Sequence, residues 1–134
     1  MKKIIKTIIA VILVMSVMCV PVCAVESNVQ PRYAYIDSIT MSFDVDGNNH
    51  SDCYAKVVTY NSSHKIVLSM QLQYYTGAGW KDLDSWVTPK TAGTVSLYKT
   101  PYVPAGYSYR LAVNVTIYDT YGNIIESQTK YATA

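Results

Sequence analysis

The sequence predicts an all-β domain, and three observations support this fold class. Apolar and polar residues alternate with a period of two through most of the chain beyond the first 35 residues. β-Branched and aromatic residues dominate these stretches, and no stretch has the spacing and caps of a helix. Turn-forming residues recur about every ten residues. Together these features favour a seven-stranded immunoglobulin-like or fibronectin-like antiparallel sandwich, with a small open β-barrel as the alternative.

The first three expected strands are separated by polar turns. Ser38–Val45 alternates apolar and polar residues and ends at the turn Asp46–Asn49. The second strand spans about Ser51–Tyr60 and ends at the polar run Asn61–Ser63. The third, Ile66–Tyr75, has the clearest alternation and is followed by two glycines, which are typical of a turn.

The remaining four strands are expected between residues 80 and 131. Trp80–Val87 and Thr94–Lys99 alternate less regularly and precede a loop with two prolines. From Tyr107 the sixth strand repeats the strict pattern to Ile117, and the opening segment Ala105–Arg110 is similar to the tyrosine corner of such sandwiches, in which a tyrosine hydroxyl ties the preceding loop to the sheet. A hairpin turn at residues 119–123 then leads into the seventh strand, Ile124–Tyr131.

Residues 1–24 have the three parts of a secretory signal peptide. A basic start with three lysines precedes an apolar run from Ile8 to Val20, which is shorter than the roughly 20 residues of a membrane-spanning helix. The small-residue pattern of Val22–Ala24 places cleavage before Val25. We therefore expect a polar lead-in over residues 25–35, a single β-sandwich domain over residues 36–134, and no transmembrane segment after cleavage.

Cleavage would change both the charge and the cysteine content. Three of the 11 basic residues lie in the signal and all nine acidic residues lie outside it, so the formal net charge falls from +2 to −1. A near-neutral domain lacks the electrostatic footprint of a nucleic-acid binder. Only Cys53 remains, so no intramolecular disulfide can form, and its place in an alternating strand predicts a buried structural thiol.

Metal-binding patterns in the sequence are weak. Asp44, Asp46 and Asp52 are spaced like part of a calcium loop, but the loop positions that need glycine and an acid hold Asn49 and Ala55. A turn between strands explains the same residues. Two histidines and one remaining cysteine do not supply the ligands of a zinc site. We therefore expect no metal and no other cofactor.

Asp82 and Asp84 are the nearest approach to a catalytic pair. They are flanked by Trp80 and Trp86, and residues two apart on a strand point to one face, as an acid pair beside a sugar platform would require. The preferred interpretation is a solvated strand edge, where charge discourages strand addition. No nucleophile elbow or phosphate loop occurs, and we expect no enzyme activity.

Aromatic residues provide the main indication of binding. The chain has 13 tyrosines and two tryptophans but only one phenylalanine, and aromatic side chains with a polar tip are common in binding surfaces. If the third and sixth strands pair in one sheet, their outer faces form a neutral, hydrogen-bonding surface edged with aromatic rings. Its candidate residues are Gln71, Gln73, Tyr75, Arg110, Asn114 and Tyr118, together with Thr116. This surface suits a glycan or a peptide backbone, and the alternative is that it contacts solvent alone.

Two segments, Leu72–Trp86 and Gly106–Ser127, resemble those of small secreted proteins of Gram-positive bacteria that are grouped in families of unknown function. The resemblance extends from about Ile36 to Tyr131. It implies a β-sandwich, export and an uncharacterised role, and it assigns no catalytic residue.

Three hypotheses follow for function. The first is an exported, non-catalytic sandwich that binds a glycan, an envelope component or a protein. The second is a secreted effector, bacteriocin-like or self-assembling, and the third is a small glycan hydrolase that uses Asp82 and Asp84. No wall-sorting tail follows Tyr131, so we expect release into the medium.

Overall fold

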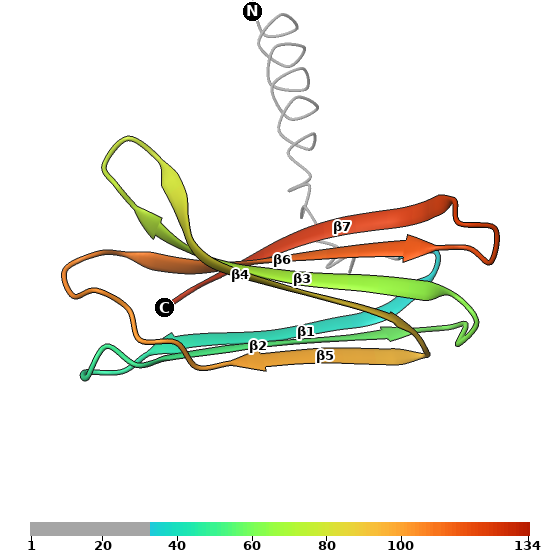
Figure 1. Cartoon of the computed structure of the whole chain (residues 1–134), viewed down its shortest axis with the longest axis horizontal. Coiled ribbons are helices and arrows are strands. Elements are labelled where there is room, and N and C mark those ends of the chain that lie inside the picture. Colours follow the sequence, from blue (N-terminus) through green and yellow to red (C-terminus); the bar gives the residue numbers. More distant parts are fainter. Residues whose placement is uncertain (1–32) are drawn as a thin grey trace, which may run out of the picture. The chain divides into compact units, whose positions relative to one another are not determined.

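A computed structural model describes residues 33–134, and within them the chain forms seven β-strands and no helix (Figure 1). The predicted signal peptide, its cleavage site and the lead-in as far as residue 32 lie outside the described residues. The strands are β1 (Ile36–Val45), β2 (Ser51–Thr59), β3 (Lys65–Tyr75), β4 (Trp80–Thr91), β5 (Thr94–Lys99), β6 (Tyr109–Tyr118) and β7 (Ile124–Thr133).

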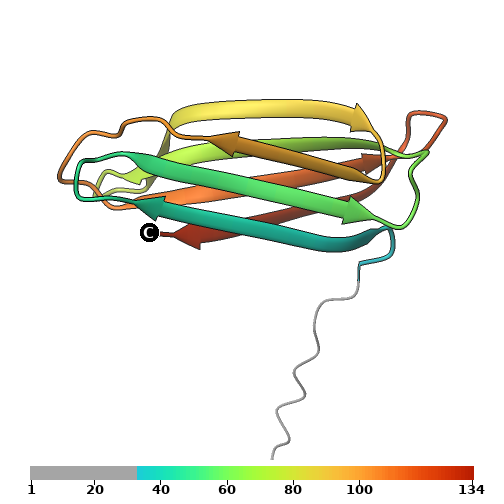
Figure 2. The same cartoon turned by 90° about the horizontal axis from the view of Figure 1, so that it is seen from below.

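The strands form two antiparallel sheets, one with the order β1-β2-β5 and one with the order β4-β3-β6-β7. Figure 2 shows the three-stranded sheet lying across the four-stranded one. β4 pairs with β3, whereas the constant-type immunoglobulin arrangement places the fourth strand in the opposite sheet. The predicted seven-stranded antiparallel sandwich is therefore confirmed, with a strand order that differs from the constant-type immunoglobulin one. Within residues 33–134 no strand pair joins the two sheets, so the barrel alternative was wrong.

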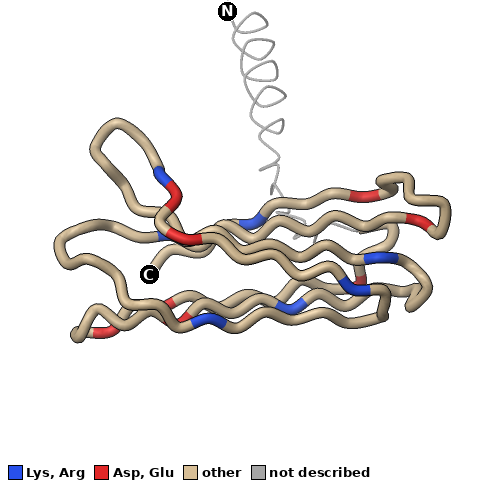
Figure 3. The backbone as a smooth tube through the Cα atoms, in the orientation of Figure 1, with Lys and Arg blue, Asp and Glu red and all other residues tan. Residues whose placement is uncertain are grey.

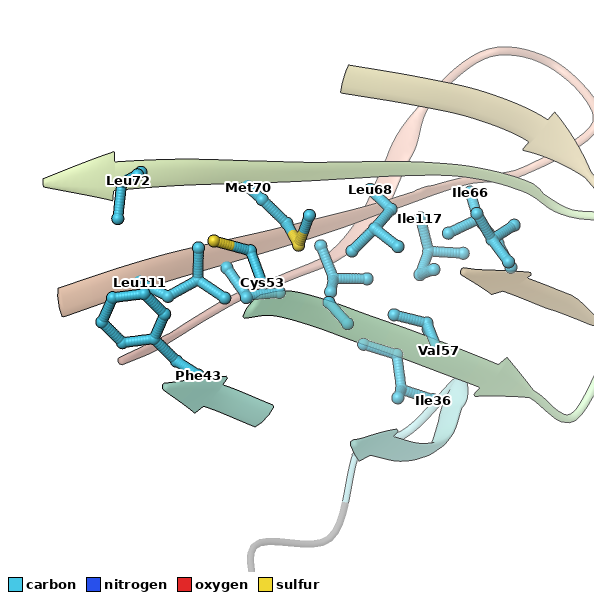
Figure 4. Packing of buried hydrophobic residues seen from close by; sticks show 14 of the residues in the cluster. Ile36, Phe43, Cys53, Val57, Ile66, Leu68, Met70, Leu72, Leu111 and Ile117 are labelled. Atoms are coloured by element: carbon cyan, nitrogen blue, oxygen red, sulfur yellow. The ribbon is translucent and has the colours of Figure 1, made fainter. Parts of the chain in front are cut away.

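The inward faces of the central strands supply the core (Figure 4). Alternate residues of β3 and β6 are buried, as the period-two pattern predicted, and Cys53, Ala55 and Val57 of β2 are fully buried opposite them. Full burial of each large apolar side chain contributes about 1.5–3 kcal/mol. The largest of these side chains are Ile66, Leu68, Met70, Leu72, Leu111 and Ile117.

β1 follows the predicted alternation less closely because it is an edge strand. Phe43 is buried, but Ile39, Met41 and Val45 are only half-buried and pack against the rim of the core. Ile36, before the predicted strand, is fully buried. A carboxylate oxygen of Glu126 on β7 accepts hydrogen bonds from the backbone N–H groups of Tyr35 (2.7 Å) and Ile36 (3.2 Å). This contact joins the start of β1 to the other sheet.

The segment before β6 forms the predicted tyrosine corner. The hydroxyl of Tyr109 donates a hydrogen bond to the carbonyl of Pro104, and the ring is only 8% exposed. Gly106 between them has φ +90°, a conformation that side-chain-bearing residues rarely adopt. Burial raises the pKa of the Tyr109 hydroxyl, which keeps it protonated as a donor.

The hairpin turns at Asp46 and Asp119 have the same construction. Asp46 Oδ1 accepts the N–H groups of Asn48 and His50, each at 2.9 Å. Asp119 Oδ1 accepts those of Tyr121 and Asn123, also at 2.9 Å each. The turn interpretation of Asp46 is thus confirmed, because its carboxylate accepts hydrogen bonds from the backbone of its own loop.

Candidate functional site

The outer face of the four-stranded sheet carries the candidate binding residues. β3 and β6 pair antiparallel, which is the condition on which the predicted surface depended, with Gln73 opposite Arg110 and Gln71 opposite Ala112. Their side chains alternate with the buried residues of the core and therefore share the face that looks away from the other sheet. Pairing of the two strands thus brings Gln71, Gln73 and Arg110 together.

A hydrogen-bonded relay crosses three strands at one end of this face. Arg110 Nε on β6 donates to Gln73 Oε1 on β3 at 2.7 Å. Gln73 Nε2 in turn donates to Asp82 Oδ1 on β4, also at 2.7 Å. Hydrogen bonds with one charged partner are stronger than neutral ones, so the relay holds all three side chains in a defined geometry.

Two aromatic rings lie close to the guanidinium of Arg110. Its Cζ lies 4.4 Å from the ring centroid of Trp80 and 4.3 Å from that of Tyr131. The Trp80 ring also contacts Tyr75, with a centroid separation of 5.3 Å. Each cation–π contact at such a site contributes about 0.5–1 kcal/mol. We call Tyr75, Trp80, Arg110 and Tyr131 the aromatic–arginine ladder.

The β3–β4 turn explains why Trp80 joins the ladder. Thr76 and Gly79 close the turn through a backbone hydrogen bond of 3.0 Å, and Gly77 has φ +88°. Tyr75 and Trp80 are therefore direct partners across the hairpin. A ring beside Tyr75 was predictable from this short turn, but Trp80 was not among the predicted binding residues.

A second group of polar side chains continues the face toward the centre of the sheet. Asn114 Nδ2 donates to Gln71 Oε1 at 3.3 Å, and Thr129 Oγ1 donates to Asn114 Oδ1 at 2.7 Å. Ala112 lies opposite Tyr131 and is only 2% exposed. The small side chain at position 112 leaves room for larger neighbours on this face.

Tyr118 is the predicted site residue that the structure separates from the others. It pairs with Lys65 at the opposite end of β6, about 27 Å from Arg110 along the strand. Its ring lies 5.7 Å from the Lys65 ammonium. Alternation along a strand places residues on a face but does not bring its two ends together, so Tyr118 does not belong to the ladder.

The prediction that Asp82 and Asp84 share a face was wrong. Asp82 is opposite Gln73, whereas Asp84 is opposite the fully buried Leu72. A bulge at Leu83 inserts one residue between them and reverses the alternation, so the two carboxylates lie on opposite faces of β4. Such a pair cannot flank one glycosidic bond.

The prediction for Cys53 is confirmed, because the thiol is fully buried in β2. Burial raises its pKa to about 11, so the reactive thiolate is scarce at neutral pH. Within residues 33–134, no three His, Cys, Asp or Glu side chains converge in a way that could hold a metal ion.

A cavity of about 550 Å³ opens at the end of the sandwich next to the ladder. Trp80, Tyr107 and Tyr109 are among its lining residues. A smaller, mainly apolar cavity of about 170 Å³ beside it is lined by Tyr74, Leu83, Pro104, Tyr107 and Tyr109. Trp80 thus borders both the sheet face and the open end of the sandwich.

No family model matches this chain, and no curated protein sequence matches it. The resemblance to small secreted bacterial proteins therefore stays a prediction. In the part of the chain that the structure describes, no helical segment has the length and hydropathy of a membrane span.

Proposed function

We propose that this chain is an exported, non-catalytic binding module and that it binds glycans through the aromatic–arginine ladder. The observation that carries the proposal is the geometry of Arg110, whose guanidinium lies over the rings of Trp80 and Tyr131 and whose Nε donates to Gln73. Side chains already ordered before binding lose little conformational entropy when a ligand arrives.

The chemistry of the ladder matches that of a sugar. Aromatic rings pack against the C–H faces of a pyranose, while planar amide, carboxylate and guanidinium groups exchange hydrogen bonds with its hydroxyls. Tyr75 and Tyr131 are 43% and 57% exposed, so both rings have surface available to a ligand. Asp82 and Gln73 add acceptors and donors within the same relay.

Export and the absence of catalysis rest on separate support. The N-terminal 24 residues have the composition of a secretory signal, and this supports secretion. The separation of Asp82 from Asp84 by the β4 bulge removes the geometry on which the hydrolase hypothesis depended. We therefore favour recognition over hydrolysis.

The test is a glycan array probed with the secreted protein, followed by calorimetric titration of each hit. Arg110→Ala and Tyr131→Ala are expected to lower affinity by about tenfold or more, because central aromatic and arginine side chains dominate binding energy. Tyr121→Ala is the matched control, since its ring is 89% exposed in the β6–β7 turn.

A pull-down from envelope extracts covers partners that the array lacks. Equal capture by wild type and by Arg110→Ala would place any binding elsewhere on the molecule. A blank array together with a blank pull-down for the wild type would refute the proposed function.

A further inference from the structure

The guanidinium of Arg110 retains hydrogen-bonding capacity at one edge. Arginine has five N–H donors, and among the described residues Arg110 donates only from Nε, to Gln73. The donors on Nη1 and Nη2 are left for a ligand. The rings of Trp80 and Tyr131, with centroids 4.4 Å and 4.3 Å from Arg110 Cζ, limit the directions from which a ligand can reach these donors.

This edge is a fork that matches a planar carboxylate. Nη1 and Nη2 together donate two parallel hydrogen bonds to the two oxygens of one carboxylate. The two nearby rings replace part of the water around the half-buried guanidinium and so strengthen a charge-assisted hydrogen bond formed there. A neutral hydroxyl uses only one of these donors and gains less from the charge.

The charges around Arg110 do not form a basic patch that would attract any anion, so an anion would be recognised by Arg110 itself. Basic and acidic positions are interspersed along residues 33–134, without a run of basic residues (Figure 3). The nearby Asp82 carboxylate accepts its hydrogen bond from Gln73, which stands between it and Arg110. An anion that binds here therefore depends on one oriented guanidinium.

We infer that the ladder recognises an acidic glycan, whose carboxylate accepts two hydrogen bonds from Arg110 and whose sugar ring packs against Tyr75 or Tyr131. This inference rests on the proposed function and specifies its ligand as a sugar that bears a carboxylate, such as a uronic acid.

The experiment compares pairs of glycans that differ only in charge. The probes are oligomers of galacturonic acid, glucuronic acid and sialic acid, each with its carboxyl-reduced counterpart, titrated into the secreted protein. We expect at least one acidic oligomer to bind about tenfold to a hundredfold more tightly than its reduced form. Added salt should weaken this binding moderately, because the contact is partly shielded from solvent.

Three variants locate the contact. Arg110→Lys keeps the charge but loses the fork, and we expect about tenfold weaker binding of the acidic oligomer. Asp82→Asn removes the nearest negative charge and should strengthen that binding. Tyr121→Ala should leave it unchanged. Unchanged binding of the acidic oligomer by Arg110→Lys would contradict the inference, because it would mean that the two parallel hydrogen bonds of the guanidinium are not used.

A measurement on the wild type keeps the test independent of folding defects in the variants. Addition of the acidic oligomer should shift the NMR signals of the Trp80 indole N–H and the Arg110 Nε–H. Binding that leaves both signals in place would overturn the assignment of the site.

The outcomes separate the inference from the proposed function. Equal binding of acidic and reduced oligomers, or array hits confined to neutral glycans, would overturn the acidic ligand and leave glycan binding intact. Absence of binding to every acidic, reduced and array glycan would overturn both.

Discussion

Asp46 and Asp119 show how a single carboxylate can organise a hairpin turn. Each accepts two backbone N–H groups of its own loop, and these hydrogen bonds favour the ionised form. The backbone N–H of His50 is the main cause of the lowered pKa of Asp46, and that of Asn123 is the main cause for Asp119. Both turns are therefore stabilised by the ionised form of their aspartate.

This dependence predicts acid sensitivity. The stabilisation by Asp46 and Asp119 is present above their ordinary pKa of 3.8 and is lost as the pH falls through the lower pKa of the folded state. The variant Asp46→Asn/Asp119→Asn should be less stable than wild type at neutral pH, and the difference should shrink in this acidic range. Denaturant unfolding at a series of pH values measures the difference in free energy of unfolding between the two proteins. A difference that stays constant as the pH falls would contradict the prediction.

Substitution of Tyr109 tests whether its hydroxyl stabilises the tyrosine corner. Tyr109→Phe keeps the buried ring but leaves the Pro104 carbonyl without its donor, so we expect the free energy of unfolding to fall by about 1–3 kcal/mol. Thermal and denaturant unfolding measure the loss. Tyr107→Phe is the control because its side chain is 51% exposed, and an equal loss in both variants would contradict the assigned role of the hydroxyl.

At the scale of strands, the sheet edges contain features that oppose strand addition. β4 has a bulge, a proline at position 89, which lacks an N–H donor, and charged residues near both ends. On β7, Glu126 and Lys130 lie on the inward face, where Glu126 binds the start of β1 and the Lys130 ammonium lies 5.6 Å from the Tyr33 ring. These devices disfavour the self-assembling hypothesis.

We accordingly expect the wild type to sediment as a monomer over a wide range of concentration. Pro89→Thr/Lys90→Thr restores an N–H donor and removes a charge at the β4 edge, so this variant should associate as its concentration rises. Analytical ultracentrifugation distinguishes the two. Lys56→Thr on the central strand β2 is the control and should stay monomeric, whereas an assembling wild type would favour the effector hypothesis.

One hydrophobic core spans both sheets, and Cys53 lies within it. The thiol belongs to the central strand of the three-stranded sheet, between edge strands β1 and β5. Exposure of Cys53 therefore requires the sandwich to open rather than a loop to move.

Labelling of Cys53 should consequently report global unfolding. In the secreted protein we expect a thiol reagent to react about a thousandfold or more slowly than in denaturant, since only the opened state exposes the thiol. The control is Tyr121→Cys in a Cys53→Ala background, which places a thiol on an exposed turn and should react quickly. Rapid labelling of native wild type would contradict the buried position.

The amino-acid pattern alone was enough to predict the number of strands, the turns, the buried face of each central strand and the tyrosine corner, and the limits of most strands, although β4 continues to Thr91, beyond its predicted end at Val87. These features depend on local chemistry: alternation along a strand, glycine and asparagine in turns, and a tyrosine at a fixed position before β6. The outer positions of Gln73 and Arg110 followed from the same alternation once β3 and β6 were assumed to pair.

Which outer residues meet could not be predicted from the sequence, because it depends on how the strands are arranged in the fold. The bulge at Leu83 places Asp82 and Asp84 on opposite faces of β4 and puts Asp82 beside Gln73. The alternation of residues in the sequence gives no indication of the inserted residue. Tyr131 reached Arg110 through the pairing of β7 with β6, whereas Tyr118 stayed at the far end. Local pattern sets the face of a side chain, but register, bulges and strand order set its neighbours, and the ladder is made of neighbours from four strands.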